Sequence, residues 1–215
     1  MALHSIAFPC PTIVFTGAPG SGKTTAMLEL GRELSGVITL AEAATAVFSH
    51  HGVDPAEEFA DVETLRAFQF AVFLKQLGAE RLLAQRARAF GSRGAILDRG
   101  LNDGGAYLPD GYDDLHRLTD VSRNDAFARY TAVVYFAPAP REVYDAVMRS
   151  KSARGKRHES YEQAVERGGL LREAWVDHPG FVEGRSGLAR EARRRSRDRP
   201  APSHHAARLL TAVFR

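Results

Sequence analysis

The segment Gly17-Ala-Pro-Gly-Ser-Gly-Lys-Thr24 contains the residue types that hold a chain of phosphates. Its spacing matches the P-loop pattern G-x-x-x-x-G-K-[ST] in full. Glycines allow a tight turn whose N–H groups point at an anion, and the lysine adds a positive charge. We therefore expect a nucleoside triphosphate to contact Gly17, Ala18, Pro19, Gly20, Ser21, Gly22, Lys23, Thr24 and Thr25.

A second candidate group follows a later apolar run, at Asp98-Arg99. The Thr24 hydroxyl and the Asp98 carboxylate are oxygen ligands of the kind that Mg²⁺ prefers, and we expect them to hold this ion. Arg99 is placed to touch phosphate or substrate. The competing interpretation of Asp98 is a solvated carboxylate at the end of a strand.

Glu42 follows the second apolar run, where a carboxylate can accept the proton of a substrate hydroxyl. The alternative is a glutamate that stabilises a helix N-terminus. Gln69 and Asp103 are candidates for contacts with an acceptor substrate, and Tyr107 borders the same loop. Gln69 equally fits a satisfied core or surface amide.

Residues 149–158 hold five lysines or arginines between two expected helices. A basic segment in this position suits a lid that closes on phosphates and neutralises charge in the transition state. The candidates are Arg149, Arg154 and Arg157, with Arg149 and Arg154 expected to take part in catalysis. A solvated loop is the alternative.

Short apolar runs alternate with segments of helical periodicity, which predicts a parallel α/β sheet with helices on both faces. We expect a three-layer P-loop NTPase fold with five strands. Residues 100–112 are expected to be a loop, and Asp54-Pro55 to start a helix. The expected strands are 12–16, 37–40, 95–98, 132–136 and 180–184, and the expected helices are 23–34, 41–48, 62–90, 141–150 and 161–177.

The formal charge of +3 is unevenly distributed. Residues 185–215 hold nine arginines against two acidic residues and so carry +7, which leaves −4 on residues 1–184. We expect 1–184 to form the nucleotide-binding domain and 185–215 to be a basic, disordered tail. Binding of nucleic acid by the acidic domain is disfavoured.

The chain has one cysteine, no apolar run long enough to cross a membrane, and no signal-peptide pattern at its start. These features favour a cytoplasmic protein without a membrane span. The sequence leaves the oligomeric state open.

The chain resembles a family of small AAA-type ATPase domains that includes the kinase domain of the bifunctional nicotinamide-nucleotide regulators and the TRP-channel translocation-defect proteins. The resemblance covers roughly residues 11–183 and depends on a spaced set of motifs. The set comprises GAPGSGKT, the AEAAT after the second strand, Gln69, LDRGLNDGGAYL, and ESYEQAVERGGLLREAW. Thr45 stands where members of the family often have an arginine.

The resemblance implies a domain akin to deoxynucleoside and nucleoside monophosphate kinases. It implies that Glu42 is the base, that Asp98 and Arg99 form the acid–arginine pair, and that ATP is the nucleotide. One hypothesis is therefore a kinase that transfers the γ-phosphate of ATP to a hydroxyl of an unknown, nucleoside-like acceptor. The alternative is a nucleotide-dependent regulatory module that hydrolyses ATP or GTP slowly.

Overall fold

A computed structural model describes residues 7–51, 61–152 and 159–184. Four sequence predictions lie outside these ranges: the tail 185–215, the helix start at Asp54-Pro55, and the lid residues Arg154 and Arg157. Within the ranges, no helix combines the length and apolar character needed to cross a lipid bilayer.

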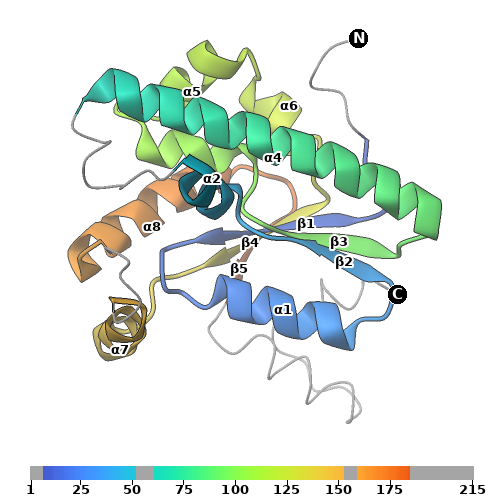
Figure 1. Cartoon of the computed structure of the whole chain (residues 1–215), viewed down its shortest axis with the longest axis horizontal. Coiled ribbons are helices and arrows are strands. Elements are labelled where there is room, and N and C mark those ends of the chain that lie inside the picture. The colour runs from blue at the N-terminus through green and yellow to red at the C-terminus, as the bar shows by residue number, and fades with distance from the viewer. Residues whose placement is uncertain (1–6, 52–60, 153–158, 185–215) are drawn as a thin grey trace.

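Five parallel strands form one sheet in the order β2-β3-β1-β4-β5 (Figure 1). Strands β1, β3 and β4 are buried along their whole length, which explains why their sequences are continuous apolar runs. The five strands predicted from the sequence are confirmed, with ends shifted by one residue at most. Their bounds are Thr12–Gly17 (β1), Val37–Leu40 (β2), Gly94–Asp98 (β3), Ala132–Phe136 (β4) and Phe181–Gly184 (β5).

The helices follow the predicted alternation with strands, and the longest has the predicted bounds, Val62–Phe90. The prediction of a loop over residues 100–112 was wrong, because a 3₁₀-helix, η1, occupies Leu101–Tyr107. Its glycines and aspartate are typical of loops, yet Leu101 and Asp103 are buried. The helices are α1 (Lys23–Glu33), α2 (Ala43–His51), α4 (Val62–Phe90), α5 (Tyr112–Thr119), α6 (Arg123–Phe127), α7 (Arg141–Ser152) and α8 (Tyr161–Trp175).

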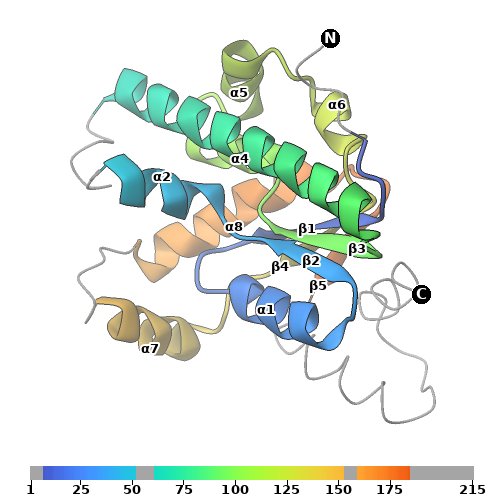
Figure 2. The same cartoon turned by 45° about the vertical axis from the view of Figure 1, so that its right-hand side comes forward.

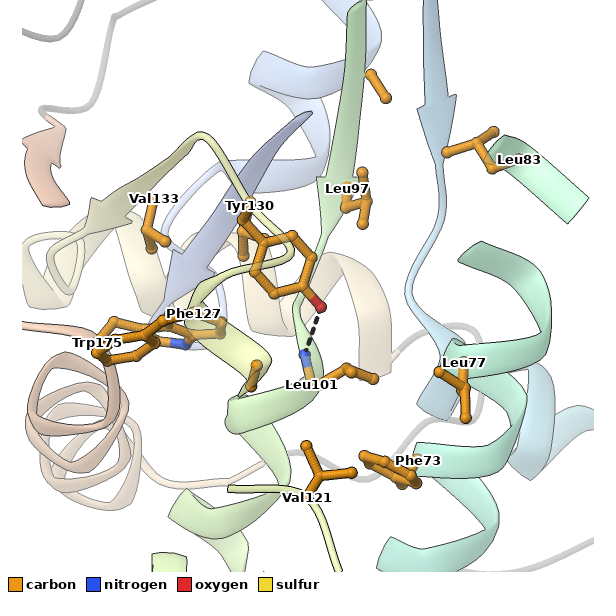
Figure 3. Close-up of a cluster of buried hydrophobic side chains, with 13 residues drawn as sticks. Phe73, Leu77, Leu83, Leu97, Leu101, Val121, Phe127, Tyr130, Val133 and Trp175 are labelled. Carbon is orange, nitrogen blue, oxygen red and sulfur yellow. Dashed lines mark hydrogen bonds between the residues drawn. The ribbon is translucent and has the colours of Figure 1, made fainter. Parts of the chain in front are cut away.

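Apolar side chains fill both sides of the sheet. Met27 and Leu30 of α1 pack beneath β1 and β4, while α4, α6 and α8 cover the opposite face (Figures 1 and 2). On that face Trp175 is fully buried beside Phe127, as Figure 3 shows. The fold therefore has three layers, as expected for an α/β P-loop protein.

Helix α8 packs directly against the phosphate-binding turn. A Cβ atom added to Gly168 would lie 3.1 Å from the Cβ of Ala18 and 3.2 Å from Cγ of Pro138. The hydroxyl of Tyr135 donates a hydrogen bond to the carbonyl of Gly168 at 3.0 Å. A capping box at Ser160 and Gln163 fixes the start of the helix. Hence α8 is held directly against the segment that follows β1.

Candidate functional site

The P-loop turns between β1 and α1 through three glycines with positive φ: Gly17 at 126°, Gly20 at 71° and Gly22 at 90°. Side chains other than glycine rarely adopt this conformation, so these positions require glycine. At Gly17 an added Cβ would also lie 2.1 Å from the carbonyl oxygen of Phe136. The turn leads into the N-terminus of α1, whose free N–H groups and dipole favour an anion.

Lys23 lies buried within this turn, and its Nζ donates to the carbonyl oxygens of Gly17 at 3.0 Å and Ala18 at 2.8 Å. Burial, followed by the positive charge of Arg99, lowers the pKa of Lys23 to about 7. The amine is therefore poised for a negative partner that would restore its charge.

The Thr24 hydroxyl donates to Oδ2 of Asp98 at 2.6 Å. A hydroxyl and a carboxylate oxygen therefore meet at the end of the P-loop, which is a donor set that suits Mg²⁺ completed by phosphates and water. Burial raises the pKa of Asp98, and the nearby charge of Lys23 opposes that effect. Among the described residues, histidine, cysteine and acidic side chains form no cluster of three or more for another metal.

Arg99 links the P-loop to the end of β2. Its Nη1 donates to the carbonyl of Gly17 at 2.9 Å, its Nε to Oε1 of Glu42 at 3.3 Å, and its Nη2 to the Tyr107 hydroxyl at 3.3 Å. Its backbone has a φ of 82°, which is uncommon for a residue other than glycine. Burial opposes the charge of this guanidinium, but surrounding acidic groups raise its pKa above the ordinary value.

Glu42 is the carboxylate that Arg99 holds at the site. Its side chain is 35% exposed, and Thr45 donates to its Oε2 at 3.0 Å. Burial alone raises the pKa of Glu42, but the charges of Arg99 and Lys23 outweigh burial and leave the pKa below its ordinary value. The carboxylate is thus ionised at neutral pH and able to accept a proton.

Asp103 lines the cavity, but its carboxylate serves partners within the protein. Its Oδ1 accepts from the Thr16 hydroxyl at 2.9 Å and from Trp175 Nε1 at 2.5 Å, and its Oδ2 lies 3.6 Å from Nη1 of Arg99. These contacts join β1, η1 and α8 behind the arginine.

A buried hydrogen-bond network supports the backbone around Arg99. Gln76 donates to the Arg99 carbonyl at 3.2 Å and to Oε1 of Glu80 at 3.0 Å. Glu80 also accepts from Tyr130 at 2.8 Å and pairs with Arg129. Figure 3 shows the Tyr130 hydroxyl accepting from the Leu101 amide, at 3.1 Å. Both sides of the strained residue are therefore fixed from the core.

These groups open onto a cavity of about 660 Å³ at the carboxyl ends of β1, β2 and β3. Ligands bind at this edge in open parallel sheets. Figures 1 and 2 place α2 between α8 and the N-terminal part of α4, around this edge. Gln69 is buried in the cavity wall beside Gly104, whose missing side chain leaves room next to the amide oxygen. The apolar lining includes Phe48, Leu65, Phe68, Val72 and Leu115.

The α8 side of the cavity carries Glu159, Gln163 and Arg167. The Arg167 guanidinium lies over the Tyr107 ring, 4.4 Å from its centroid, and donates to the carbonyl of Ala106. Burial raises the pKa of Tyr107 to about 12, so its hydroxyl stays protonated. Tyr107 is consequently held between two arginines, with Arg99 at its hydroxyl and Arg167 on its face.

A sequence model of the AAA domain matches residues 12–182, which is most of the chain. The chain belongs to the AAA domain family. No curated protein matches its sequence.

Solved structures share the fold of this AAA domain. A NadR protein in complex with NR matches with a TM-score of 0.62 and 17% identity, over 95% of this chain and 52% of that one. A NadR protein in complex with NAD and AMP-PNP matches with a TM-score of 0.58 and 13% identity, over 91% and 52%. This chain therefore spans about half the length of those proteins. At these identities the likeness shows a P-loop kinase-like fold.

The AAA domain brings together eight of the predicted site residues around one cavity: Pro19, Gly20, Lys23, Thr24, Glu42, Gln69, Asp98 and Arg99. Asp103 also lines this cavity, and its carboxylate makes the contacts with Thr16 and Trp175 described above. Arg149 does not line the cavity and is exposed on α7, whereas its neighbour Met148 does line it. Sequence reasoning missed Glu159 and Arg167. The only available signal was their place within the family motif ESYEQAVERGG.

Proposed function

We propose that this AAA domain is a phosphotransferase that moves the γ-phosphoryl group of ATP to a hydroxyl of a small, nucleoside-like molecule. The observation that carries the proposal is the bridge formed by Arg99. One guanidinium contacts both the P-loop carbonyl of Gly17 and the carboxylate of Glu42. This bridge supports a role for the ionised carboxylate next to the terminal phosphate of a nucleotide bound by the P-loop.

The P-loop amides and Lys23 would bind the phosphates. The Thr24 hydroxyl and Asp98 would hold Mg²⁺, which when bound neutralises charge on the phosphate oxygens. Arg99 then supplies a fixed positive charge at the point where negative charge redistributes during transfer.

In the transfer step, the acceptor oxygen forms a bond to the γ-phosphorus. The bond between that phosphorus and the β–γ bridging oxygen breaks, and ADP leaves with the electron pair. The acceptor hydroxyl proton passes to the carboxylate of Glu42, whose lowered pKa keeps it ready to accept one. Hydrogen bonds from Thr45 and Arg99 orient this carboxylate.

The cavity size and its lining support a small organic acceptor. A volume of about 660 Å³ lies in the range of small-molecule sites, and aromatic and aliphatic side chains form much of the wall. Apolar walls exclude water, which protects the phosphoryl group from hydrolysis. The complexes of the two NadR structures, one with NR and one with NAD and AMP-PNP, support a nucleotide-like ligand pair.

The deciding experiment is the substitution Glu42→Gln in the full chain. We expect phosphoryl transfer to an acceptor to fall by at least about 100-fold, because the base is lost, while affinity for a non-hydrolysable ATP analogue stays within a few-fold. Glu166→Gln, on the exposed surface of α8, is the matched control and should leave both quantities unchanged.

Transfer by Glu42→Gln at the normal rate would remove Glu42 as the base. If no small hydroxyl compound accelerates ATP consumption by the unmodified protein, the proposal fails. The nucleotide-dependent regulatory module would then be favoured instead.

A further inference from the structure

Two buried polar atoms on the α8 side of the cavity lack hydrogen-bond partners among the described residues: Oε2 of Glu159 and Nε of Arg167. The two side chains form an ion pair with each other, in which Oε1 of Glu159 lies 3.7 Å from the same Nε, beyond hydrogen-bond distance. Both residues line the cavity that also contains Glu42 and Arg99. The ion pair balances the two charges, but a buried donor and acceptor without hydrogen bonds are costly, and an incoming ligand would relieve that cost.

Contacts to the Arg167 side chain and to the Glu159 backbone position the pair. Arg167 stacks on Tyr107 and bonds to the carbonyl of Ala106, and the Tyr144 hydroxyl donates to the carbonyl of Glu159 at 2.7 Å. One residue further along, Gly168 seats α8 against Ala18 of the P-loop. The pair therefore has a fixed position relative to the phosphate-binding turn.

The chemistry of the pair restricts what it can bind. Glu159 needs a donor and Arg167 needs an acceptor, and a hydroxyl is both at once. A carboxylate or phosphate would be attracted by Arg167 but repelled by Glu159. An ammonium group would be attracted by Glu159 but repelled by Arg167. A neutral hydroxyl can hydrogen-bond to both atoms without bringing a charge close to another charge of the same sign.

We propose that Glu159 and Arg167 form an acceptor-binding pair that receives a second hydroxyl of the substrate, distinct from the one that takes the phosphate. This inference rests on the proposed function and narrows the acceptor to a compound with at least two hydroxyls. Glu159 accepts from that hydroxyl through Oε2, while Nε of Arg167 donates to its oxygen.

The test compares binding of ribonucleosides with binding of their 2′-deoxy and 3′-deoxy counterparts, in the presence of a non-hydrolysable ATP analogue. For the unmodified protein, we expect removal of one of these hydroxyls to weaken binding by about 10- to 100-fold, the usual range for a hydrogen bond to a charged group. In Glu159→Ala that preference should disappear, with affinity for the deoxy compound nearly unchanged. Glu166→Gln, exposed on the same helix, should keep the full preference.

Each of the other possible results contradicts the assignment of Glu159 and Arg167 as an acceptor-binding pair. If Glu159→Ala weakens binding of the ribonucleoside and of its deoxy counterpart equally and also lowers the Tm, Glu159 has a structural role only. A preference that survives Glu159→Ala would place the hydroxyl elsewhere. If the unmodified protein binds no ribonucleoside, the assignment also fails. The proposed kinase activity is judged separately, by whether other hydroxyl acceptors accelerate ATP consumption.

Discussion

Arg99 shows how much of this site depends on single side chains. Its backbone takes a left-handed φ of 82°, and its side chain reaches the carbonyl of Gly17 in the P-loop. Such a conformation costs on the order of 1–3 kcal/mol and persists when its surroundings compensate for it. The hydrogen bonds from Gln76 to the Arg99 carbonyl and from the Leu101 amide to Tyr130 supply that compensation.

The lowered pKa of Lys23 predicts that the protein takes up a proton when it binds a triphosphate. Its pKa of about 7 in the free protein means that much of it is neutral at pH 8. A triphosphate favours the charged form and raises this pKa, so binding takes up close to one proton at pH 8. Affinity should then fall as the pH rises above 7, because the proton that binding requires becomes scarcer.

Calorimetric titration of the ATP analogue at pH 8, in two buffers with different ionisation enthalpies, measures this uptake. The observed heats should differ by the difference in buffer enthalpy multiplied by the number of protons. Lys23→Arg, which stays charged throughout, should abolish the dependence. Heats that are identical in both buffers for the unmodified protein would contradict the prediction.

At the scale of elements, α8 is the part of the fold that joins the two sides of the cavity. It carries Trp175 in the core, Arg167 in the cavity wall, and Gly168 against the P-loop. The helix itself was predictable from its amphipathic pattern. Its closeness to the P-loop was not, because that closeness depends on a contact between Ala18 and Gly168, far apart in the chain.

The close approach of α8 predicts opposite effects for two adjacent glycines. Gly168→Ala places a methyl group 3.1 Å from Ala18 and 3.2 Å from the Pro138 ring, neither of which is a flexible side chain. We expect it to lower the free energy of unfolding by about 1–3 kcal/mol. Gly169→Ala meets no atom within 4 Å and should raise that free energy by about 0.5–1 kcal/mol through its higher helix propensity.

Urea denaturation of the two variants beside the unmodified protein measures both changes. The matched positions separate crowding from helix propensity, since the same substitution is made one residue apart. A stabilising effect of Gly168→Ala equal to that of Gly169→Ala would show that α8 is free to move away from the P-loop.

The parts of the site that could be predicted from the sequence are motifs whose residues lie next to one another in the chain. The P-loop, Glu42 after β2, and Asp98-Arg99 at the end of β3 each follow a short apolar run, and the parallel sheet brings these ends together. The buried pair of Glu80 and Arg129 was not predictable, because its members lie 49 residues apart, one on α4 and the other in the turn after α6. The helical η1 was missed since its glycines favour a loop and only burial of its side chains orders it.

At the scale of the whole molecule, nucleotide binding should stabilise the entire fold. Any ligand that binds only the native state adds about 2.7 kcal/mol at a concentration 100 times its Kd. For a chain of this size that corresponds to a rise in Tm of roughly 5–10 °C. We expect this rise with a non-hydrolysable ATP analogue and Mg²⁺, and a much smaller one after EDTA removes the metal.

Thermal unfolding followed by circular dichroism measures the shift. Lys23→Ala serves as the comparison, because it removes the positive charge within the P-loop and should suppress the rise. A full rise in Lys23→Ala, or one unaffected by EDTA, would contradict the assignment of Lys23, Thr24 and Asp98 to triphosphate and metal binding.

The burial of Trp175 at the end of α8 has a consequence for synthesis on the ribosome. The phosphate-binding turn emerges early, but the indole that bonds to Asp103 and packs beside Phe127 arrives more than 150 residues later. A nascent chain thus has its P-loop long before it has a finished core. Under the proposed function, we therefore expect phosphoryl transfer only after α8 has been synthesised and has packed into this core.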